Sequence, residues 1–118
     1  MQFEVRFYYT RDKSKPLKIF LEDLRQADPV LHKLVVKGLE KLKDSDRHGP
    51  PLTAWADRKL QIYELRVGSA NIARVFFYFR PGQVIMATNG YVKKSKKVDS
   101  QELELARQYK RDWEERFR

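Results

Sequence analysis

The chain has 118 residues, of which 42% are hydrophobic, 13% aromatic and 35% charged, a composition that suits one globular domain over residues 1–118 and leaves no room for two. Cysteine is absent and only two histidines are present, which excludes disulfides, thiol nucleophiles and Cys-rich zinc sites, so we expect neither a metal nor a cofactor. The formal net charge of +9 favours a polyanionic partner, while no apolar run approaches the roughly 18 residues needed to cross a bilayer, so we expect a cytoplasmic protein without membrane contact.

The first half of the chain predicts one strand followed by two helices. Residues 3–9 place Phe, Val, Phe and Tyr at every second position, which is the period of a half-buried strand. Pro16 begins a segment whose leucine and phenylalanine residues recur at helical spacing. Asp28 and Pro29 supply the N-cap and first residue of a second helix, whose apolar stripe continues to Leu42. The two helices are expected to form a hairpin.

The second half predicts a loop, three strands and a closing helix. Residues 44–57 contain the helix and strand breakers Gly49, Pro50 and Pro51 and show no regular period, so we expect an ordered loop there. The two-residue period then returns in three segments joined as two hairpins, over residues 60–67, 72–79 and 84–92. Asp99 with Glu102 predicts a capped final helix. The order β-α-α-β-β-β-α predicts an α+β domain whose antiparallel sheet carries its helices mainly on one face.

The excess positive charge is concentrated in residues 58–97. This block holds nine basic residues and one acidic residue, whereas residues 1–57 hold 11 basic and nine acidic residues. Because the basic residues are interleaved with residues that have the pattern of a core, the charge is expected on folded structure rather than on a tail. A solubilising surface without a specific ligand is the alternative.

Cations on neighbouring strands form the candidate site. Arg66 and Arg74 lie on adjacent predicted strands, and Tyr91, Lys93 and Lys94 end the third, so the sheet is expected to bring them together. Arginine presents a planar fork to two phosphate oxygens and lysine a point charge, which suits a phosphodiester and a pentavalent phosphorane. Aromatic rings beside these cations are expected to stack on unpaired bases. The residues expected to contact RNA are Lys59, Tyr78, Lys93, Lys96 and Lys97.

These residues also have structural explanations. Arg66 can pair with Glu64 on the same strand face, and Tyr78 can pack under the final helix. The lysines at 93–97 can form a solvated loop. Glu64 is the one carboxylate of the basic block, which argues against a nuclease that uses two metal ions, since such an enzyme needs several converging carboxylates.

Several short motifs carry a resemblance to a known family. They are Ile-Phe-Leu-Glu-Asp-Leu at 19–24, Gly-Pro-Pro-Leu at 49–52, Tyr-Glu-Leu-Arg at 63–66, Ala-Arg-Val-Phe-Phe-Tyr at 73–78, Gly-Tyr-Val-Lys-Lys at 90–94 and Glu-Leu-Ala at 104–106. With these motifs the chain resembles, over nearly its whole length, the phage-derived Gp49-like, HigB-like branch of the RelE/ParE toxin superfamily. The resemblance implies a RelE-like fold.

The resemblance also implies a function, the toxin of a type II toxin–antitoxin system. Such a toxin acts as a ribosome-dependent mRNA endonuclease, an mRNA interferase that inhibits translation. The ribose 2′-OH attacks the adjacent phosphate without help from a metal ion. The implied partners are mRNA, the ribosome and a cognate antitoxin, usually of the helix-turn-helix type, with which the protein would form a hetero-oligomer.

By motif position the resemblance assigns catalytic roles to four residues. Arg66 and Arg74 match the two strand arginines that hold the scissile phosphate. Lys94 matches the basic group near the end of the third strand, which stabilises the phosphate or the leaving group. Tyr91 occupies an aromatic position beside it, where stacking or proton transfer is expected.

The identity of the general base and two other functions stay open. Glu64 stands where relatives with a defined base carry a lysine, so Lys59, His48 and Tyr91 are the candidates for proton transfer. A non-catalytic module that binds RNA, the ribosome or a partner would use the same basic face. So would a ParE-like inhibitor of gyrase, because one fold serves both activities.

Overall fold

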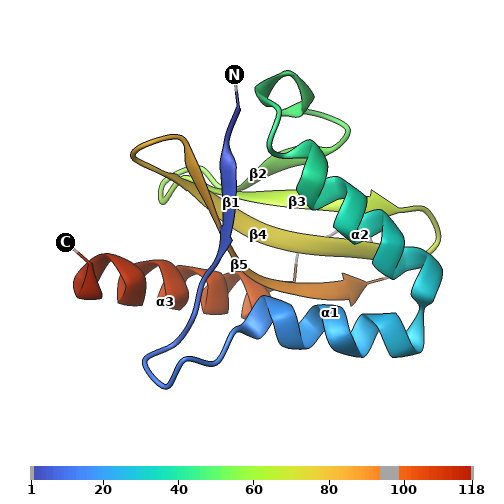
Figure 1. The fold of residues 1–118 in the computed structure, drawn as a ribbon, viewed down its shortest axis with the longest axis horizontal. Coiled ribbons are helices and arrows are strands. Elements are labelled where there is room, and N and C mark those ends of the chain that lie inside the picture. The colour runs from blue at the N-terminus through green and yellow to red at the C-terminus, as the bar shows by residue number, and fades with distance from the viewer. Residues whose placement is uncertain (1, 94–98, 118) are drawn as a thin grey trace.

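The computed structural model describes residues 2–93 and 99–117, so the predicted site residues Lys94, Lys96 and Lys97 lie outside the described residues. Within these ranges one strand is followed by two helices, then by four strands and a final helix (Figure 1). The elements are β1 (Glu4–Phe7), α1 (Pro16–Ala27), α2 (Pro29–Lys41), the short 3-10 helix η1 (Ser45–Arg47), β2 (Thr53–Asp57), β3 (Ile62–Gly68), β4 (Ile72–Arg80), β5 (Val84–Lys93) and α3 (Ser100–Arg116).

The strands of the described residues form one five-stranded sheet in the order β1-β5-β4-β3-β2. Strands β2 to β5 pair antiparallel with their neighbours, as predicted for the three hairpin strands. Strand β1 instead pairs parallel with β5, with Glu4 opposite Val84. The α+β class is therefore confirmed. The sheet is mixed rather than wholly antiparallel, because β1 pairs in parallel with β5, a strand far along the chain.

The loop predicted for residues 44–57 contains η1 and the edge strand β2. This strand pairs antiparallel with β3, placing Trp55 opposite Tyr63, and a register shift follows between Trp55 and Asp57. Its sequence, Thr-Ala-Trp-Ala-Asp, is too short and too weakly alternating to show a period. The strand conformation follows from pairing with β3 rather than from local preference.

Helices cover both faces of the sheet. The leucines of α1 and α2 pack on one face, against Leu65, Val75, Phe77 and Ile85. Helix α3 covers the opposite face, where its Leu103, Ala106 and Trp113 join two smaller clusters that include Phe76, Tyr78, Met86 and Tyr91. Two of the three helices thus share a face as expected. The third lies opposite because β4 is apolar on both sides and buries six consecutive residues, 73–78.

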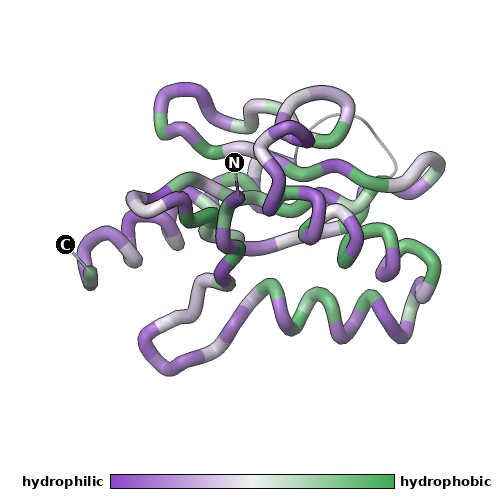
Figure 2. Tube along the Cα trace, turned by 45° about the horizontal axis from the view of Figure 1, so that its top comes forward, coloured by the Kyte–Doolittle hydropathy of each residue, from purple (hydrophilic) through white to green (hydrophobic). Residues whose placement is uncertain are grey.

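Local sequence explains where the helices begin. Pro16 and Pro29 occupy the first turns of α1 and α2, and the Asp28 side chain accepts a hydrogen bond from the Leu31 amide. The Asp99 carboxylate caps α3 in the same way. Hydrophobic and hydrophilic residues alternate along α1 in Figure 2, as an amphipathic helix requires. Among the described residues, none of the helices combines the length and apolarity needed to span a membrane.

Candidate functional site

Strands β3, β4 and β5 place three of the predicted catalytic residues in one row. Arg66 lies opposite Arg74, and Arg74 lies opposite Tyr91. Because directly paired residues point to the same side of a sheet, all three side chains leave the face that α3 covers. Lys93 lies two residues after Tyr91, at the same end of the sheet. The sequence-based expectation that the strands bring these residues together is confirmed.

Glu64, two residues before Arg66 on β3, links the two arginines of this row. Its Oε1 atom accepts a hydrogen bond of 2.8 Å from Arg66 Nε and one of 2.9 Å from Arg74 Nη1. The Glu64 side chain is fully buried, the Arg74 side chain is 1% exposed, and that of Arg66 is 41% exposed. One carboxylate against two guanidinium groups leaves this cluster positively charged. The predicted pairing of Arg66 with Glu64 is confirmed, and Arg74 shares the same acceptor.

Arg74 is buried. In this structure a phosphate could reach its guanidinium, whose side chain is 1% exposed, only by displacing the residues around it. Arg74 instead holds the buried carboxylate of Glu64, which in turn fixes the half-exposed Arg66. Arg74 is therefore placed to hold Glu64 and, through it, Arg66, and Arg66 is the member of the pair that is open to solvent.

Tyr91 is buried as well. The residue is 9% exposed and its ring stacks on Phe76, with centroids 5.9 Å apart. Its hydroxyl oxygen accepts a 2.8 Å hydrogen bond from the Asp99 amide, at the start of α3. Burial raises the pKa of the Tyr91 hydroxyl, so the phenol stays protonated at neutral pH and is a weak base. Tyr91 thus connects the sheet to the start of α3 through its hydroxyl group, while its ring packs on Phe76.

Tyr78, expected to contact RNA, is buried. Only 1% of the residue is exposed and it lies under α3 with Met86 and Trp113, so this structure does not present its ring to a base. The Lys110 ammonium group of α3 lies over its ring, 5.4 Å from the centroid. Burial also raises the pKa of the Tyr78 hydroxyl. The alternative, packing under the final helix, describes its environment.

The two predicted lysines within the described residues occupy different ends of the sheet. Lys93 belongs to the same end as Arg66, and its ammonium nitrogen is 3.9 Å from a carboxylate oxygen of Asp99. Lys59 is exposed in the turn between β2 and β3, at the opposite end of β3 from Arg66. The structure therefore separates Lys59 from the candidate site, and with it one candidate for the general base.

Arg66 also lines a cavity of about 630 Å³ whose basic residues the sequence did not reveal. The cavity lies between the end of α2, the Gly-Pro-Pro loop and the ends of β3 and β4, and Lys41 and Arg47 line it together with Arg66. Among the described residues that line it, Asp46 is the one acidic residue. Lys41 and Arg47 are exposed and lie far from Arg66 in sequence, so only the folded chain makes the three residues line one cavity.

His48 lies in the same loop and is held in place. Its Nε2 atom is 2.8 Å from the Leu42 carbonyl oxygen, to which it donates a hydrogen bond because a carbonyl can only accept. Its ring contacts Phe3 and Phe79, with centroids 5.3 and 5.6 Å away. This ring nitrogen is therefore engaged with the backbone, which leaves Nδ1 as the atom of His48 that could exchange a proton.

The arrangement suits recognition of an anion. Arg66 donates to Glu64 through Nε alone, and its two terminal nitrogens make no hydrogen bond with the described part of the chain. These two donors can bind two phosphate oxygens at once. Among residues 2–93 and 99–117, no group of three or more His, Cys, Asp or Glu side chains is placed so that it could hold a metal ion.

The fold and the site define a small α+β protein with an arginine fixed by a buried carboxylate beside a basic cavity. The model of one family, Phage derived protein Gp49-like, matches residues 22–111, which is most of the chain and includes Glu64, Arg66, Arg74 and Tyr91. The chain belongs to this family, as its motifs indicated, and this membership indicates the toxin of a toxin–antitoxin pair. A comparison with curated protein sequences gives no significant match.

Proposed function

We propose that this protein is the toxin of a type II toxin–antitoxin pair and that it cleaves mRNA on the ribosome. The observation that carries the proposal is Arg66. In a member of a toxin family, its guanidinium is half-exposed, fixed by the buried Glu64–Arg74 pair, and beside a cavity that Lys41 and Arg47 also line. Such a group is suited to holding the phosphate of a polyanionic strand.

The chemistry needs no cofactor. The ribose 2′-OH attacks the adjacent phosphorus, the bond to the 5′ oxygen of the next nucleotide breaks, and the products are a 2′,3′-cyclic phosphate and a 5′-OH. Arg66 would hold two phosphate oxygens and stabilise the additional negative charge of the phosphorane. Glu64 keeps the arginine from swinging into solvent, so part of the orientation is present before the RNA binds.

Positioning and electrostatic stabilisation therefore provide most of the rate in this proposal. The buried phenol of Tyr91 and the distant Lys59 are unsuited to taking the 2′ proton, for the reasons given above. His48 lies in the lining of the same cavity as Arg66. Its Nδ1 is the remaining candidate for proton transfer among those that the sequence suggested.

The expected partners follow from the same proposal. The ribosome presents the message, and a cognate antitoxin, expected to be a helix-turn-helix protein, keeps the toxin inactive in a hetero-oligomer. Co-expression with the neighbouring reading frame tests this partner, because a cognate antitoxin would both restore growth and co-purify with the toxin.

A cell-free translation reaction tests the activity. Purified protein is added to one defined message at a fixed salt concentration, with and without ribosomes, and new 5′ ends are mapped. We expect new ends only on translated message, and Arg66→Ala should reduce their rate of formation by about 10²-fold or more, the scale for loss of one charge-stabilising donor. Arg25→Ala, which removes the same charge from the exposed surface of α1, is the matched control and should cleave normally.

A non-catalytic ribosome-binding module is the second candidate. The observation that favours it is the burial of Arg74 and Tyr91, which leaves Arg66 as the accessible member of the row. This candidate predicts that translation stops while the message stays intact, with a strong dependence on salt. An unaffected translation reaction together with inhibited DNA supercoiling would instead indicate a gyrase inhibitor.

A further inference from the structure

A second cavity lies on the other side of the Gly-Pro-Pro loop from the basic cavity. It has a volume of about 650 Å³, within the range of sites for small organic ligands. His48, Gly49 and Pro50 line both cavities, so the two are neighbours that share one wall. The remaining wall of the second cavity comes from β2, β3 and β4.

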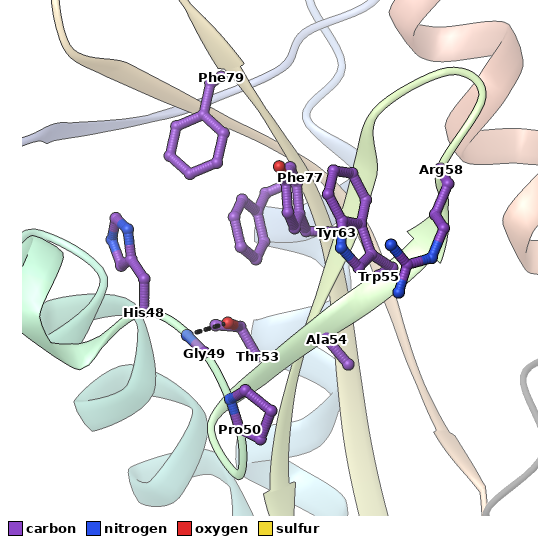
Figure 3. Close-up of a pocket in the computed structure, with 10 residues that line it drawn as sticks. All are labelled: His48, Gly49, Pro50, Thr53, Ala54, Trp55, Arg58, Tyr63, Phe77 and Phe79. Carbon is purple, nitrogen blue, oxygen red and sulfur yellow. Dashed lines mark hydrogen bonds between the residues drawn. The ribbon is translucent and has the colours of Figure 1, made fainter.

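Aromatic rings form that wall. Trp55 stacks on Tyr63, with centroids 4.2 Å apart and planes inclined by 26°, and Tyr63 stacks on Phe77 at 5.5 Å and 17°. The three residues are in direct register on three adjacent strands. Phe79 meets Tyr63 edge to face at 5.1 Å. Figure 3 shows these rings on one side of the cavity and the loop with His48 and Pro50 on the other.

The cavity is preformed and open to solvent. Two hydrogen bonds between Gly49 and Thr53 hold the loop against β2. The Gly49 amide donates to Thr53 Oγ1 at 2.7 Å (Figure 3), and the Thr53 amide donates to the Gly49 carbonyl at 3.0 Å. Gly49 adopts φ +106°, a conformation that favours glycine. Trp55 and Phe79 are each 38% exposed, so a planar ligand can reach their rings without unfolding the loop.

The charge at the cavity indicates an anionic ligand. The guanidinium of Arg58 lies over the Trp55 ring, 5.2 Å from its centroid, and Arg58 also lines the cavity. Of the described residues that line it, none is Asp or Glu. A nucleotide combines the two features that match this site, a planar base for the aromatic wall and a phosphate for the arginine.

We propose that this cavity binds one unpaired nucleobase of an RNA strand whose neighbouring phosphate lies in the basic cavity beside Arg66. The shared loop wall sets the two subsites next to each other, so one strand can fill both. The site would thereby contribute to the choice of the message position that is cut. This inference deepens the proposed function, and its binding test needs neither ribosomes nor cleavage, so the two can fail separately.

Nuclear magnetic resonance titration of the ¹⁵N-labelled protein tests the proposal. The probes are adenosine monophosphate, ribose 5-phosphate, a single-stranded adenosine trinucleotide and an acidic peptide that carries one phenylalanine. We expect the mononucleotide to shift the Gly49 and Ala54 amides and the Trp55 indole N–H in a saturable way. Ribose 5-phosphate should bind at least tenfold more weakly, because it lacks the base.

Variants separate the two subsites. Trp55→Ala should weaken mononucleotide binding about tenfold, and Arg58→Gln, which leaves the aromatic wall intact, should weaken it several-fold. Arg25→Gln on α1 is the control for a general loss of charge and should bind normally. The trinucleotide should bind more tightly than the mononucleotide, and Arg66→Ala should remove that additional affinity.

Four results would overturn the proposal. They are an absence of saturable shifts at the cavity, equal binding of ribose 5-phosphate, a trinucleotide that binds no more tightly than the mononucleotide, and tighter binding of the acidic peptide than of any nucleotide. The last would assign the cavity to a protein partner. Normal backbone spectra of the variants will show that a loss of binding does not reflect unfolding.

Discussion

Replacing Glu64 by glutamine is expected to destabilise the protein and release Arg66. Glutamine has nearly the same shape as glutamate but no charge, so the substitution removes the ion pairs while leaving an acceptor in place. The Glu64 side chain is fully buried and its partner Arg74 is 1% exposed. Breaking a buried pair by removing one charge costs about 3–5 kcal/mol, whereas the pair with the 41% exposed Arg66 contributes only about 0–1 kcal/mol.

Urea unfolding, followed by circular dichroism, measures this cost. With an m-value of about 2 kcal/mol/M, a loss of about 4 kcal/mol lowers the unfolding midpoint by roughly 2 M. Because small domains are stable by about 5–15 kcal/mol, Glu64→Gln is expected to remain folded without denaturant. Arg66→Ala should shift the midpoint by less than about 0.5 M, and Glu22→Gln on the exposed surface of α1 is the matched control.

The comparison of the variants can refute this reasoning. If Glu64→Gln and Arg66→Ala lower the midpoint equally, the buried half of the network is not the stronger half. If Glu64→Gln shifts the midpoint no further than Glu22→Gln, the carboxylate of Glu64 does not contribute to stability. In either case Arg66 would have to be held in place by something other than the buried pair.

Three further predictions concern the fold. In Gly90→Ala the new Cβ would lie 2.8 Å from Cδ2 of Phe20, so the free energy of unfolding should fall by about 1–3 kcal/mol, measured by thermal unfolding. An unchanged Tm would contradict the close approach of α1 to β5. Asp28→Ala removes the N-cap of α2 and should cost about 0.5–2 kcal/mol in the same assay. A hydrogen bond from the Leu60 amide, and after it one from Arg107, lower the pKa of Asp57 in the folded protein. Protonation of Asp57 therefore favours the unfolded chain, and the free energy of unfolding should fall as the pH drops below about 4. Asp57→Asn should flatten that acid limb in urea unfolding between pH 3 and 6, and an unchanged slope would argue against this carboxylate.

Local patterns made much of the fold predictable. The helices beginning at Pro16 and Pro29 and the final helix capped by Asp99 follow from capping residues next to a helical period. The three hairpin strands follow from their two-residue alternation. These signals depend on neighbouring residues, which is why they can be read from one chain without its tertiary contacts.

The remaining features depend on contacts between distant segments. Strand β2 is defined by its pairing with β3, and β1 by a parallel partner near the other end of the chain. The face that α3 covers follows from the second apolar side of β4, which also buries Tyr78. No local pattern distinguishes a strand residue under a helix from one that faces solvent at the sheet end.

The sequence predicted which residues of the site lie together better than it predicted which of them a ligand can reach. Strand pairing brings Arg66, Arg74 and Tyr91 into one row, as expected from the hairpins. Exposure, however, depends on what covers each position, and only Arg66 is open to a ligand. Lys41 and Arg47 could not be assigned to the site from the sequence, because they belong to the end of α2 and to η1. Only the fold places these elements beside the same cavity as Arg66.

Cleavage of a message with one modified ribose tests the central proposal most directly. A position that the protein cuts in a translated message is replaced by its 2′-deoxy form, and both messages are translated with wild-type protein and with Arg66→Ala. The proposal predicts a cut with a 2′,3′-cyclic phosphate in the unmodified message, none at the deoxy position, and almost none with the variant. Cleavage at the deoxy position, or a normal rate with Arg66→Ala, would contradict attack by the 2′-OH on a phosphate held by Arg66.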